Sequence, residues 1–337
     1  MSTTPLLPAD VTTAELPLVC IYVITYNGKR FLERCFQTLQ ELTDYGNYQL
    51  ILTDNGSSDG SGAYVRENFP QVDVLRVFPN AGYAHGANQA VQDARRRGAK
   101  YVALMNDDIE IIHPQWLRDA VAHAECDPSI GIISFAEATF DVGLIQAHES
   151  TLTDVNYLSG FAMVFPIELF DRIGTFDEIY FVVGDEDDLG ARAQAAGYRL
   201  VRMSLPIYHL GGGTNQNYSL RTAYFQMRNG IRFCLKNRHP MRALLRSLRI
   251  IDVACNPWPF TLDKNDAAHR RMRNSGNVFI NAWLWLRAVS WNLVHLLQTL
   301  RIRAAERRLC GAADTGGESL KAVRGPARNP ATSNRDG

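Results

Sequence analysis

Short runs of consecutive apolar residues alternate along the chain with segments in which apolar positions recur every three or four residues. Residues 18–24 and 101–105 are continuous apolar runs, which are typical of strands buried on both faces. After the first run, Leu32, Cys35 and Leu39 recur at helical spacing. This alternation of strands and helices predicts an α/β fold with a largely parallel sheet. The same pattern predicts further strands at 48–53, 72–78, 130–135, 160–165 and 199–203, and further helices at 86–97, 114–124 and 189–196.

Polar loops follow four of the predicted strands, and they begin at Thr25, Asp54, Asn80 and Asn106. Because the carboxyl ends of parallel strands meet at one edge of a sheet, all four loops can face one crevice, where open α/β sheets bind ligands. The fourth loop, residues 106–108, reads Asn-Asp-Asp. Two carboxylates at the end of a buried strand are costly unless hydrogen bonds or a cation compensate them. A divalent metal that carries a phosphate would do so, and an exposed turn with two solvated acids is an equal alternative.

The charge of the chain is unevenly distributed, although its formal net charge is zero. Residues 1–220 hold 14 Lys and Arg against 28 Asp and Glu, whereas residues 221–310 hold 17 against 4. This asymmetry indicates metal and substrate chemistry in the acidic part and an anionic surface as partner of the basic part. We therefore predict an N-terminal tail at 1–16, an α/β domain at 17–220, a basic helical extension at 221–310 and a disordered tail at 311–337.

Several classes of protein are disfavoured by the sequence. Six cysteines are scattered without C-x-x-C spacing, so neither a zinc site nor a disulfide scaffold is predicted. Residues 1–17 lack the basic and apolar regions of a secretory signal, and no apolar run reaches about 18 residues. The Arg-rich part lacks a recognisable nucleic-acid-binding motif, and the acidic part would repel nucleic acid. These observations predict a cytoplasmic protein that does not bind nucleic acid.

The basic extension contains an aromatic and apolar segment at 278–300 that is too polar to span a bilayer. Its tryptophans, flanked by arginines such as Arg273 and Arg301, suit a helix that lies in an anionic membrane interface, here the inner face of the plasma membrane. Packing on the α/β domain, or a contact between copies of the chain in a homo-oligomer, explains the same residues equally well. The sequence leaves these alternatives open.

Six motifs, in this order and at this spacing, resemble the family 2 glycosyltransferases of the GT-A fold, especially bacterial rhamnosyltransferase-like members. The resemblance covers roughly residues 18–235. It implies a Rossmann-like GT-A fold, with a mostly parallel sheet flanked by helices and the basic helical extension after it. The motifs are residues 23–27, 53–60, 80–88, 106–108, 185–188 and His209.

The resemblance implies a nucleotide-sugar site at the first three loops. Asp54 would contact the base and ribose, since a carboxylate accepts hydrogen bonds from N–H and hydroxyl groups. The loop around residues 80–88 would lie near the nucleotide sugar, where glycine permits close approach of the backbone. An ordinary turn at Asp54 and a helix entry at 80–88 are the alternatives. The implied substrate-binding residues are Thr25, Tyr26, Asn27, Asp54, Asn55, Asn80, Gly82, Asn88, Asn106 and Asp107.

The resemblance also implies a metal site. Residues 106–108 match the D-x-D position of the family, with Asn in place of the first acid. Asp108 would be the direct metal ligand, and His209 aligns with a histidine that completes the site in several relatives. Oxygen ligands suit Mg²⁺ or Mn²⁺, and an imidazole favours Mn²⁺ slightly.

The acid cluster at 185–188 resembles the family's E-D-x-D-L motif, whose second acid is the usual general base. This correspondence implies Glu186 as the base. The family has Asp at that position, so Asp185 or Asp187 could take the role instead. Adjacent acids at a helix start raise each other's pKa, and the helix N-terminus partly offsets the effect. A base with a pKa near neutrality suits activation of a hydroxyl group.

Together these motifs imply an inverting, metal-dependent glycosyltransferase. It would move a sugar from a dTDP- or UDP-sugar to a hydroxyl of a saccharide or lipid-linked acceptor in cell-envelope polysaccharide synthesis, with L-rhamnose from dTDP-rhamnose favoured. One base suffices, because a single displacement needs no second carboxylate as nucleophile. A nucleotidyltransferase is the alternative enzyme class, although residues 25–30 hold only one glycine of the expected phosphate loop. A non-catalytic nucleotide-sugar-binding module is the other alternative.

Overall fold

The structure, a computed structural model, describes residues 16–138, 150–210, 220–238, 240–255 and 278–313. Nine strands form one sheet. They are β1 Val19–Thr25, β2 Tyr48–Asp54, β3 Asp73–Arg76, β4 Tyr101–Asn106, β5 Ile109–Glu110, β6 Ile130–Ala138, β7 Leu152–Asp154, β8 Ala162–Pro166 and β9 Arg199–His209.

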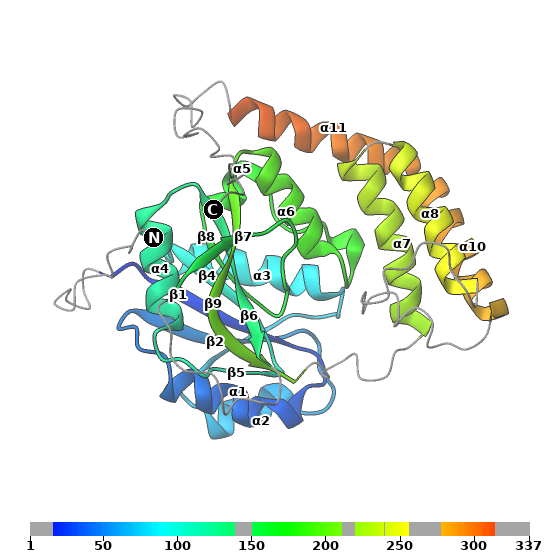
Figure 1. Cartoon of the computed structure of the whole chain (residues 1–337). Helices are drawn as coiled ribbons and strands as arrows, with labels where there is room; N and C mark the ends of the chain where they lie inside the picture. Colours follow the sequence, from blue (N-terminus) through cyan, green and yellow to red (C-terminus); the bar gives the residue numbers. More distant parts are fainter. Residues whose placement is uncertain (1–15, 139–149, 211–219, 239, 256–277, 314–337) are drawn as a thin grey trace, which may run out of the picture.

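Helices surround this sheet and continue beyond it (Figure 1). Those interleaved with the strands are α1 Lys29–Glu41, α2 Ser61–Asn68, α3 Tyr83–Arg96, α4 Trp116–Cys126, α5 Leu169–Ile173, the 3₁₀ helix η2 Glu178–Tyr180 and α6 Asp185–Ala195. The helices after β9 are α7 Leu220–Asn237, α8 Pro240–Cys255, α10 Val278–Val294 and α11 Leu296–Ala313. The mostly parallel sheet flanked by helices, with a helical part after it, is confirmed.

The strands follow the order β3-β2-β1-β4-β8-β6-β9-β5, and β7 pairs with β9. The pairs β3–β2, β2–β1 and β1–β4 are parallel, as predicted. Beyond β4 the sheet is mixed, because β8 runs antiparallel to both β4 and β6. The short strands β5 and β7 were not predicted, since two or three residues are too few to show a period.

The continuous apolar run of β1 is explained by two layers of helices. Val19, Ile21 and Val23 belong to a core shared with α1, α2 and α4. The alternate residues Cys20 and Tyr22 belong to a second core shared with α3, α5 and α6. Because successive side chains point to opposite faces of a strand, a strand covered on both faces needs apolar residues throughout.

The helices after β9 form a smaller unit that packs on the side of α6. α7 contacts α6, α8, α10 and α11. In Figure 1, α8 and α10 lie on the side of α7 that faces away from the sheet. A small apolar cluster joins α7, α8 and α10. Its buried members are Ala223, Met227, Ile231, Ile250, Leu284 and Ala288.

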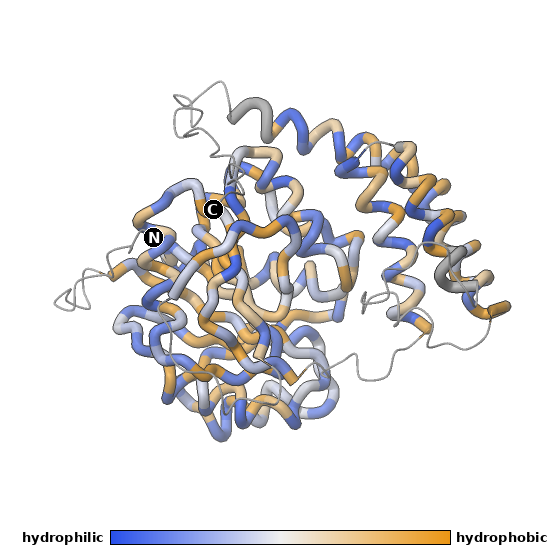
Figure 2. Tube along the Cα trace, viewed as in Figure 1, coloured by the Kyte–Doolittle hydropathy of each residue, from blue (hydrophilic) through white to orange (hydrophobic). Residues whose placement is uncertain are grey.

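Apolar residues are also plentiful on the outer helices, as the orange segments of α8 and α10 in Figure 2 show. Nevertheless, none of the helices in the described part of the chain is both long and apolar enough to cross a bilayer.

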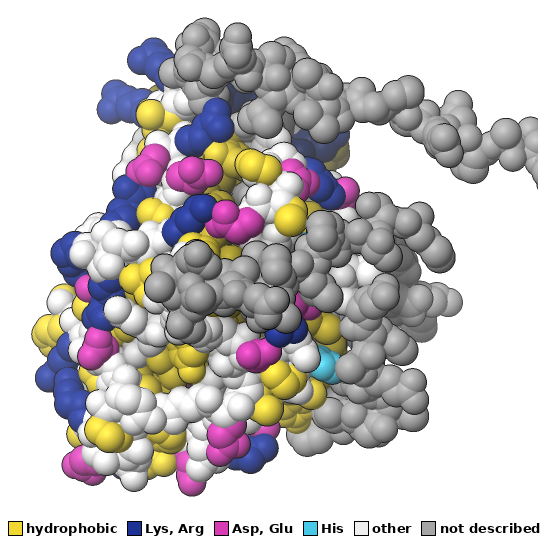
Figure 3. All heavy atoms as spheres, turned by 90° about the vertical axis from the view of Figure 1, so that its left-hand side faces the viewer, with side chains coloured by type: hydrophobic (Ala, Val, Ile, Leu, Met, Phe, Trp, Pro, Cys, Tyr) yellow, Lys and Arg dark blue, Asp and Glu magenta, His cyan; other side chains and the backbone are white. Residues whose placement is uncertain are grey.

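On the opposite side of the molecule, Lys or Arg and Asp or Glu side chains are interspersed among the residues drawn in colour (Figure 3). The predicted tails fall mostly outside the described residues, which begin at 16 and end at 313, where α11 also ends.

Candidate active site

The first two predicted loops begin side by side because β1 and β2 are in register. Thr25 and Asp54 are partners at the ends of these strands. The backbone N–H of Asn55 donates to the carbonyl of Thr25 at 2.9 Å and ties the loops together. The carboxylate of Asp54 is buried and accepts from the N–H of Ser57 at 2.8 Å. Asp54 therefore lies at the predicted nucleotide end of the sheet, with its side chain fixed by its own loop.

Asn27 connects the same two loops from the other side. Its side-chain oxygen accepts from the N–H of Ser58 at 2.8 Å, and its own N–H donates to the hydroxyl of Ser57 at 3.0 Å. Its φ of +56° is uncommon outside glycine, but Asn is among the residues that tolerate it best. The neighbouring Tyr26 is 39% exposed, so its ring is accessible from solvent.

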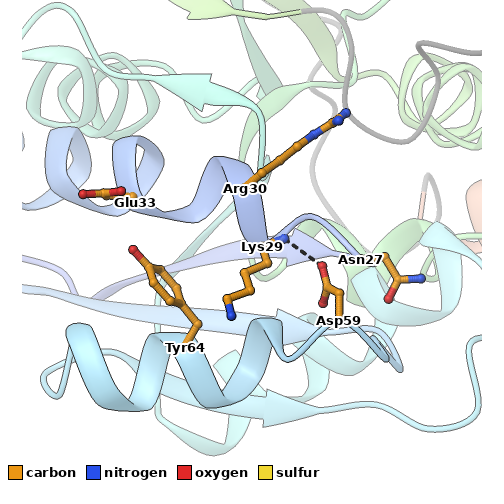
Figure 4. Close-up of a pocket in the computed structure, with 6 residues that line it drawn as sticks. All are labelled: Asn27, Lys29, Arg30, Glu33, Asp59 and Tyr64. Carbon is orange, nitrogen blue, oxygen red and sulfur yellow. Dashed lines mark hydrogen bonds between the residues drawn. The ribbon is translucent and has the colours of Figure 1, made fainter.

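An open pocket of about 600 Å³ lies beside Asn27 (Figure 4). Asp59 accepts from the backbone N–H of Lys29 at 3.0 Å, and the Lys29 ammonium lies 5.5 Å from the centre of the Tyr64 ring. The pocket includes neither the carboxylates that follow β4 nor the acid cluster, so we do not place the reaction there. Its lining residues are Asn27, Lys29, Arg30, Glu33, Asp59 and Tyr64.

The third loop approaches the backbone just before the acid cluster very closely. The side chain of Asn80 accepts from the N–H of Gly82 at 2.8 Å, and Asn55 donates to the carbonyl of Gly82 at 2.9 Å. A Cβ at Gly82 would lie 2.2 Å from the carbonyl oxygen of Phe181, and the φ of Gly82 is +101°. Only glycine fits here. The resemblance implied that glycine in this loop lets the backbone approach the nucleotide sugar, which stays a prediction; the neighbour that the structure shows at Gly82 is the backbone of Phe181.

Asn88 lies one turn into α3, and its side chain contacts protein groups. Its amide donates to the carbonyl of Phe176 at 3.0 Å and to Glu178 at 2.8 Å. Its side-chain oxygen accepts from the N–H of Phe176 at 2.9 Å. These bonds anchor the segment that leads to the acid cluster. A role of Asn88 in binding substrate stays a prediction.

The fourth loop brings Asp108 and His209 together. Pairing of β5 with β9 places Ile109 opposite His209. Nε2 of His209 lies 3.3 Å from Oδ1 of Asp108, and Nδ1 lies 2.8 Å from Glu137. Burial lowers the pKa of the imidazole, but the two carboxylates outweigh burial and raise it overall. The two residues that the resemblance implied as metal ligands are therefore neighbours, although 100 residues separate them in sequence.

Asp107 points the other way, toward β1. Its carboxylate accepts a hydrogen bond of 2.5 Å from the hydroxyl of Thr25. Burial raises its pKa to about 7, and the negative charge of Asp108 adds to the shift. Asp107 therefore contributes to the packing of the loop rather than pairing with His209. Its implied role in substrate binding is not tested by these contacts.

A divalent cation fits the pair Asp108 and His209 chemically. Among the residues described, no group of three or more His, Cys, Asp or Glu side chains could enclose a metal ion. Mg²⁺ in phosphate-transferring sites is commonly held by one or two protein ligands together with the phosphates of the substrate. Asp108 would offer an oxygen ligand and His209 an imidazole ligand, a donor set that agrees with such a site and with Mn²⁺.

The acid cluster forms the first turn of α6, after Gly184 with a φ of +86°. Oε2 of Glu186 accepts from the N–H of Gly184 at 3.1 Å. Burial raises the pKa of both Asp185 and Glu186. The charge of Asp185 raises the pKa of Glu186 further, whereas a hydrogen bond with Glu186 opposes the rise at Asp185. Burial and the charge of Glu186 raise the pKa of Asp187 to about 7, although Arg246 opposes the shift. The pKa values of these three acids therefore lie closer to neutrality than those of ordinary carboxyl groups.

Asp188 differs from its three neighbours, and the sequence did not reveal this. It is fully buried and accepts from Lys236 at 2.8 Å, from Asn237 at 2.8 Å and from Arg192 at 3.1 Å. Burial alone would raise its pKa, but Arg192 and Lys236 outweigh burial and lower it. Asp188 is therefore an ion-paired carboxylate that fixes α6, not a candidate base.

The segment Gly160–Phe161 connects the acid cluster to the metal-ligand pair. A Cβ at Gly160 would lie 3.4 Å from the side-chain carboxyl carbon of Glu186. The carbonyl of Phe161 accepts from the N–H of Asn106 at 2.8 Å, and its ring stacks on His209 with 4.7 Å between centres. Of two adjacent residues, Gly160 thus lies near Glu186 and Phe161 contacts His209.

α7 holds the turn that precedes the acid cluster. Phe181 and Val183 have φ values of +64° and +68°, which are strained for side chains of this kind. Asn229 donates to the carbonyls of Tyr180, Val182 and Val183 at 2.7–2.9 Å. Arg228 donates to the carbonyl of Tyr180 at 3.0 Å. The basic extension therefore packs directly on the candidate active site.

A buried cluster of three acids and three bases reinforces this contact. Asp177 accepts from Arg232 at 2.8 Å and from Lys236 at 2.9 Å. Burial opposes ionisation of Asp177, but these two cations outweigh it and lower its pKa to about 2. Residues 228, 232 and 236 recur every four positions, a signal that could have identified one face of α7. The cluster comprises Asp177, Asp188, Glu306, Arg192, Arg232 and Lys236.

The profile of the family described as "Glycosyl transferase family 2" matches residues 20–176. This segment contains the loops of Thr25, Asp54, Asn80 and Asp108. Residues 20–176 belong to glycosyl transferase family 2. The acid cluster and His209 follow the matched segment of this glycosyltransferase domain, so they complete the candidate site from outside it.

Relatives of the glycosyltransferase domain are distant. An "Uncharacterized protein y4gI" of Sinorhizobium fredii is 30% identical over 219 residues, which are 55% of this chain and 23% of that protein. An "N-acetylglucosaminyl-diphospho-decaprenol L-rhamnosyltransferase" of Mycobacterium tuberculosis is 25% identical over 226 residues, which are 55% of this chain and 72% of that protein. The chain thus spans about a quarter of the first relative and most of the second.

The fold matches a solved glycosyltransferase along almost its whole length. The mannosyltransferase PcManGT of Pyrobaculum calidifontis, in complex with GDP-Man and Mn²⁺, has a TM-score of 0.53 and 19% identity, and the match covers 93% of this chain and 91% of that chain. At this identity the likeness shows the fold alone. The GT-A fold implied by the motifs is therefore confirmed.

Proposed function

We propose that this protein transfers a sugar, with inversion and with the help of a divalent metal, from a nucleotide diphosphate donor to a hydroxyl of a saccharide or lipid-linked acceptor. The proximity of Gly160 to the carboxyl group of Glu186, next to the stacking of Phe161 on His209, carries the proposal. Residues 160 and 161 thus lie between the proposed proton acceptor, Glu186, and the proposed metal ligands, Asp108 and His209. Leaving-group stabilisation and acceptor activation can therefore take place in one crevice.

Donor binding is assigned to the joined ends of β1 and β2. The buried carboxylate of Asp54 would accept from the base or ribose of the nucleotide. The exposed ring of Tyr26 and the fixed amide of Asn27 would lie beside it. These contacts select a nucleotide and hold its diphosphate toward the end of β4.

Asp108 and His209 would hold Mn²⁺ or Mg²⁺. When bound, the ion would supply positive charge next to the departing nucleotide diphosphate. Glu137 lies 2.8 Å from the other nitrogen of His209 and fixes the orientation of its ring. Phe161 packs on the same ring and limits the access of water from that side.

Glu186 would take the proton from the acceptor hydroxyl, with Asp185 and Asp187 as the alternatives. All three have a raised pKa, which keeps a carboxylate basic enough to accept that proton. Asp188 is excluded from this role by its ion pairs. Inversion follows from a single displacement in which the acceptor oxygen attacks opposite the leaving nucleotide.

Two buried polar atoms in this region support a ligand rich in hydroxyl groups. Oδ2 of Asp185 and the hydroxyl of Tyr83 are buried and have no hydrogen-bond partner within the described part of the protein. Burial raises the pKa of Tyr83, and the carboxylates of Asp185 and Glu186 add to the shift, so the three groups lie near one another. Buried polar atoms are rarely left unpaired, and sugar hydroxyls would pair with them.

Within this activity we favour L-rhamnose from dTDP-rhamnose, with a UDP-sugar as the alternative donor. The rhamnosyltransferase from Mycobacterium tuberculosis supports this choice, since its name specifies a diphospho-decaprenol acceptor. A lipid-linked acceptor in envelope polysaccharide synthesis would require the protein to act at the inner face of the plasma membrane. A homo-oligomer remains an alternative use of the outer helices.

The experiment is donor turnover across a panel of nucleotide sugars with Mn²⁺ or Mg²⁺. We expect one donor to release nucleoside diphosphate in a metal-dependent reaction that is lost in Asp108→Ala and in Glu186→Gln. Asp188→Asn is avoided as a control because it would disturb folding, and Arg66→Gln on α2 serves instead. Release of pyrophosphate would indicate a nucleotidyltransferase. Donor binding without turnover, in the presence of diverse acceptors, would indicate a non-catalytic binding module.

A further inference from the structure

An apolar face runs along the outer side of α8 and α10, and we call it the outer helical face. Each of its six large apolar side chains is more than half exposed. Leu248 follows Leu244 by four residues and Leu245 by three, and Leu286 lies three residues after Trp283 and seven before Leu293, so the side chains of each helix gather on one side. The residues are Leu244, Leu245 and Leu248 on α8, and Trp283, Leu286 and Leu293 on α10.

The two helices are held together from their inner side. The indole N–H of Trp285 donates to the carbonyl of Ser247 at 2.9 Å. Ile250 and Leu284 are buried in the cluster shared with α7. The core contacts of α8 and α10 are therefore already satisfied by inward-facing residues. A contiguous exposed apolar patch on a protein surface typically marks an interaction site.

The charge of the outer helical face is positive. Residues 241–250 and 278–305 contain no Asp or Glu, and both Arg242 and Arg287 are exposed. The guanidinium of Arg287 lies 4.5 Å from the centre of the Trp283 ring. By contrast, charges of both signs are interspersed on the opposite side of the molecule (Figure 3).

We propose that the outer helical face docks on an anionic phospholipid bilayer, with the leucines and Trp283 in the interface and Arg242 and Arg287 at the headgroups. A second copy of the chain fits less well, because a two-fold contact would place this positive surface against itself. An anionic leaflet attracts the same arginines and accepts the apolar side chains. Since none of the described helices could span a bilayer, they would lie along its surface.

Docking would place the protein at the membrane that contains a lipid-linked acceptor. Only this link to sugar transfer rests on the proposed function. α7 lies between the outer helical face and the turn that precedes Glu186 (Figure 1). The acceptor head group would therefore need to extend only past one helix to reach the crevice. Binding to lipid itself needs neither donor nor acceptor.

The test is co-sedimentation of the full chain with vesicles of phosphatidylglycerol and phosphatidylcholine, compared with vesicles of phosphatidylcholine alone. We expect binding to the anionic vesicles and its loss at about 1 M salt, where charges are screened within ~3 Å. Arg242→Gln and Arg287→Gln should each weaken binding about fivefold. The pair Trp283→Gln and Leu286→Gln should weaken it at least about tenfold. Thermal unfolding would verify that each variant is folded.

Matched substitutions elsewhere on the surface serve as controls. Arg66→Gln on α2 and Tyr157→Gln, both at exposed positions, should leave vesicle binding unchanged. The proposal is overturned if the folded wild-type chain stays in the supernatant, or if the face variants sediment like the wild type. A dimer that Leu245→Gln dissociates would also overturn it, in favour of a second copy. Because the assay contains no donor, its failure is separate from a failure of sugar transfer.

Discussion

The side-chain amide of Asn229 on α7 donates to the backbone carbonyl of Val183 at 2.7 Å. Val183 has a φ of +68°, which is a strained conformation for a β-branched residue. The same amide also reaches the carbonyls of Tyr180 and Val182. Glu186 follows three residues later. α7 therefore stabilises the backbone that positions the candidate base in a conformation unfavourable for its own sequence.

Asn229→Ala should lower kcat more than it affects donor binding. Loss of the amide frees the strained turn, so Glu186 is no longer held against Gly160, whereas the donor loops at β1 and β2 are untouched. We expect kcat to fall about tenfold or more, because small misplacements of a reacting group are costly. The dissociation constant of the donor should change less than about twofold, since no contact of the donor loops is removed. Steady-state turnover assays measure kcat, and titration with the donor measures its dissociation constant.

Asn68→Ala is the control for this substitution. Asn68 on α2 also donates its amide to a backbone carbonyl, that of Tyr64, at 2.8 Å. Asn68→Ala should lose at most roughly 1 kcal/mol of stability, because it removes one exposed hydrogen bond. Asn229→Ala should lose more, because it removes three hydrogen bonds of a buried amide. Only Asn229→Ala should lose kcat. Equal kcat in the two variants would show that α7 does not position the base.

The activity should depend on pH through the acid cluster. A base acts when it is deprotonated, and burial and Asp185 raise the pKa of Glu186 above the ordinary value of about 4.3. At saturating donor, kcat should therefore rise with pH across the neutral range rather than near pH 4. Asp185→Asn removes a negative neighbour and lowers the pKa of Glu186. The rise of kcat with pH, which we call the acidic limb of the profile, should therefore move to lower pH. A pH profile of kcat for both proteins measures the shift.

The same pair of profiles distinguishes the alternative bases. If Asp185 is the base, Asp185→Asn should lose most of its activity at every pH instead of shifting the limb. If Asp187 is the base, Glu186→Gln should retain activity, and its acidic limb should move down because the charge of Glu186 raises the pKa of Asp187. Loss of activity in Glu186→Gln alone, with a shifted limb in Asp185→Asn, assigns the base to Glu186.

The sequence was sufficient for those parts of the fold that depend on local pattern. The continuous apolar runs correctly identified β1 and β4, since burial on both faces demands apolar residues throughout. Placement of Thr25 beside Asp54 followed from parallel pairing. α3 begins at Tyr83, three residues before the predicted start. The helix begins directly after Gly82, which lies against Phe181, and this contact between distant residues cannot be read from the local spacing of apolar residues.

The contacts that the sequence could not supply join segments far apart in the chain. Asp188 looks like its three acidic neighbours until Lys236 and Arg192 are placed beside it. Arg228 and Asn229 contact carbonyl groups, which every residue has, so no residue type identifies their partner. Basic residues on a helix are usually solvated, and only the fold shows that Lys236 is buried.

Tyr83→Phe should stabilise the protein while lowering its activity. The Tyr83 hydroxyl is buried and has no partner in the described part of the protein. Leaving such a group unpaired costs about 1–3 kcal/mol, so its removal should raise the free energy of unfolding by roughly 1 kcal/mol. If the hydroxyl binds sugar, kcat/KM should fall about tenfold through loss of one buried hydrogen bond. Urea denaturation and steady-state kinetics measure these opposite changes.

Tyr22→Phe provides the opposite control. The Tyr22 hydroxyl is also buried but donates to Asp93 at 2.9 Å, away from the acid cluster. Its removal should destabilise the protein by about 1–2 kcal/mol and leave kcat/KM unchanged. If Tyr83→Phe behaves like Tyr22→Phe in both measurements, its hydroxyl has a structural partner and does not contact the sugar.

Lys236→Met should strongly destabilise the protein, because it removes one of three cations from a buried cluster with three carboxylates. The Lys236 ammonium contacts Asp177, Asp188 and Glu306 at 2.7–2.9 Å, and its side chain is fully buried. Breaking a buried pair leaves an uncompensated charge, at a cost of roughly 3–5 kcal/mol. Lys100→Met breaks the exposed pair with Glu125 and should cost less than about 1 kcal/mol. Urea denaturation measures the free energy of unfolding of both variants. Equal losses would mean that water or a change of protonation compensates the unpaired carboxylates. These charges would then not anchor α7 to α6.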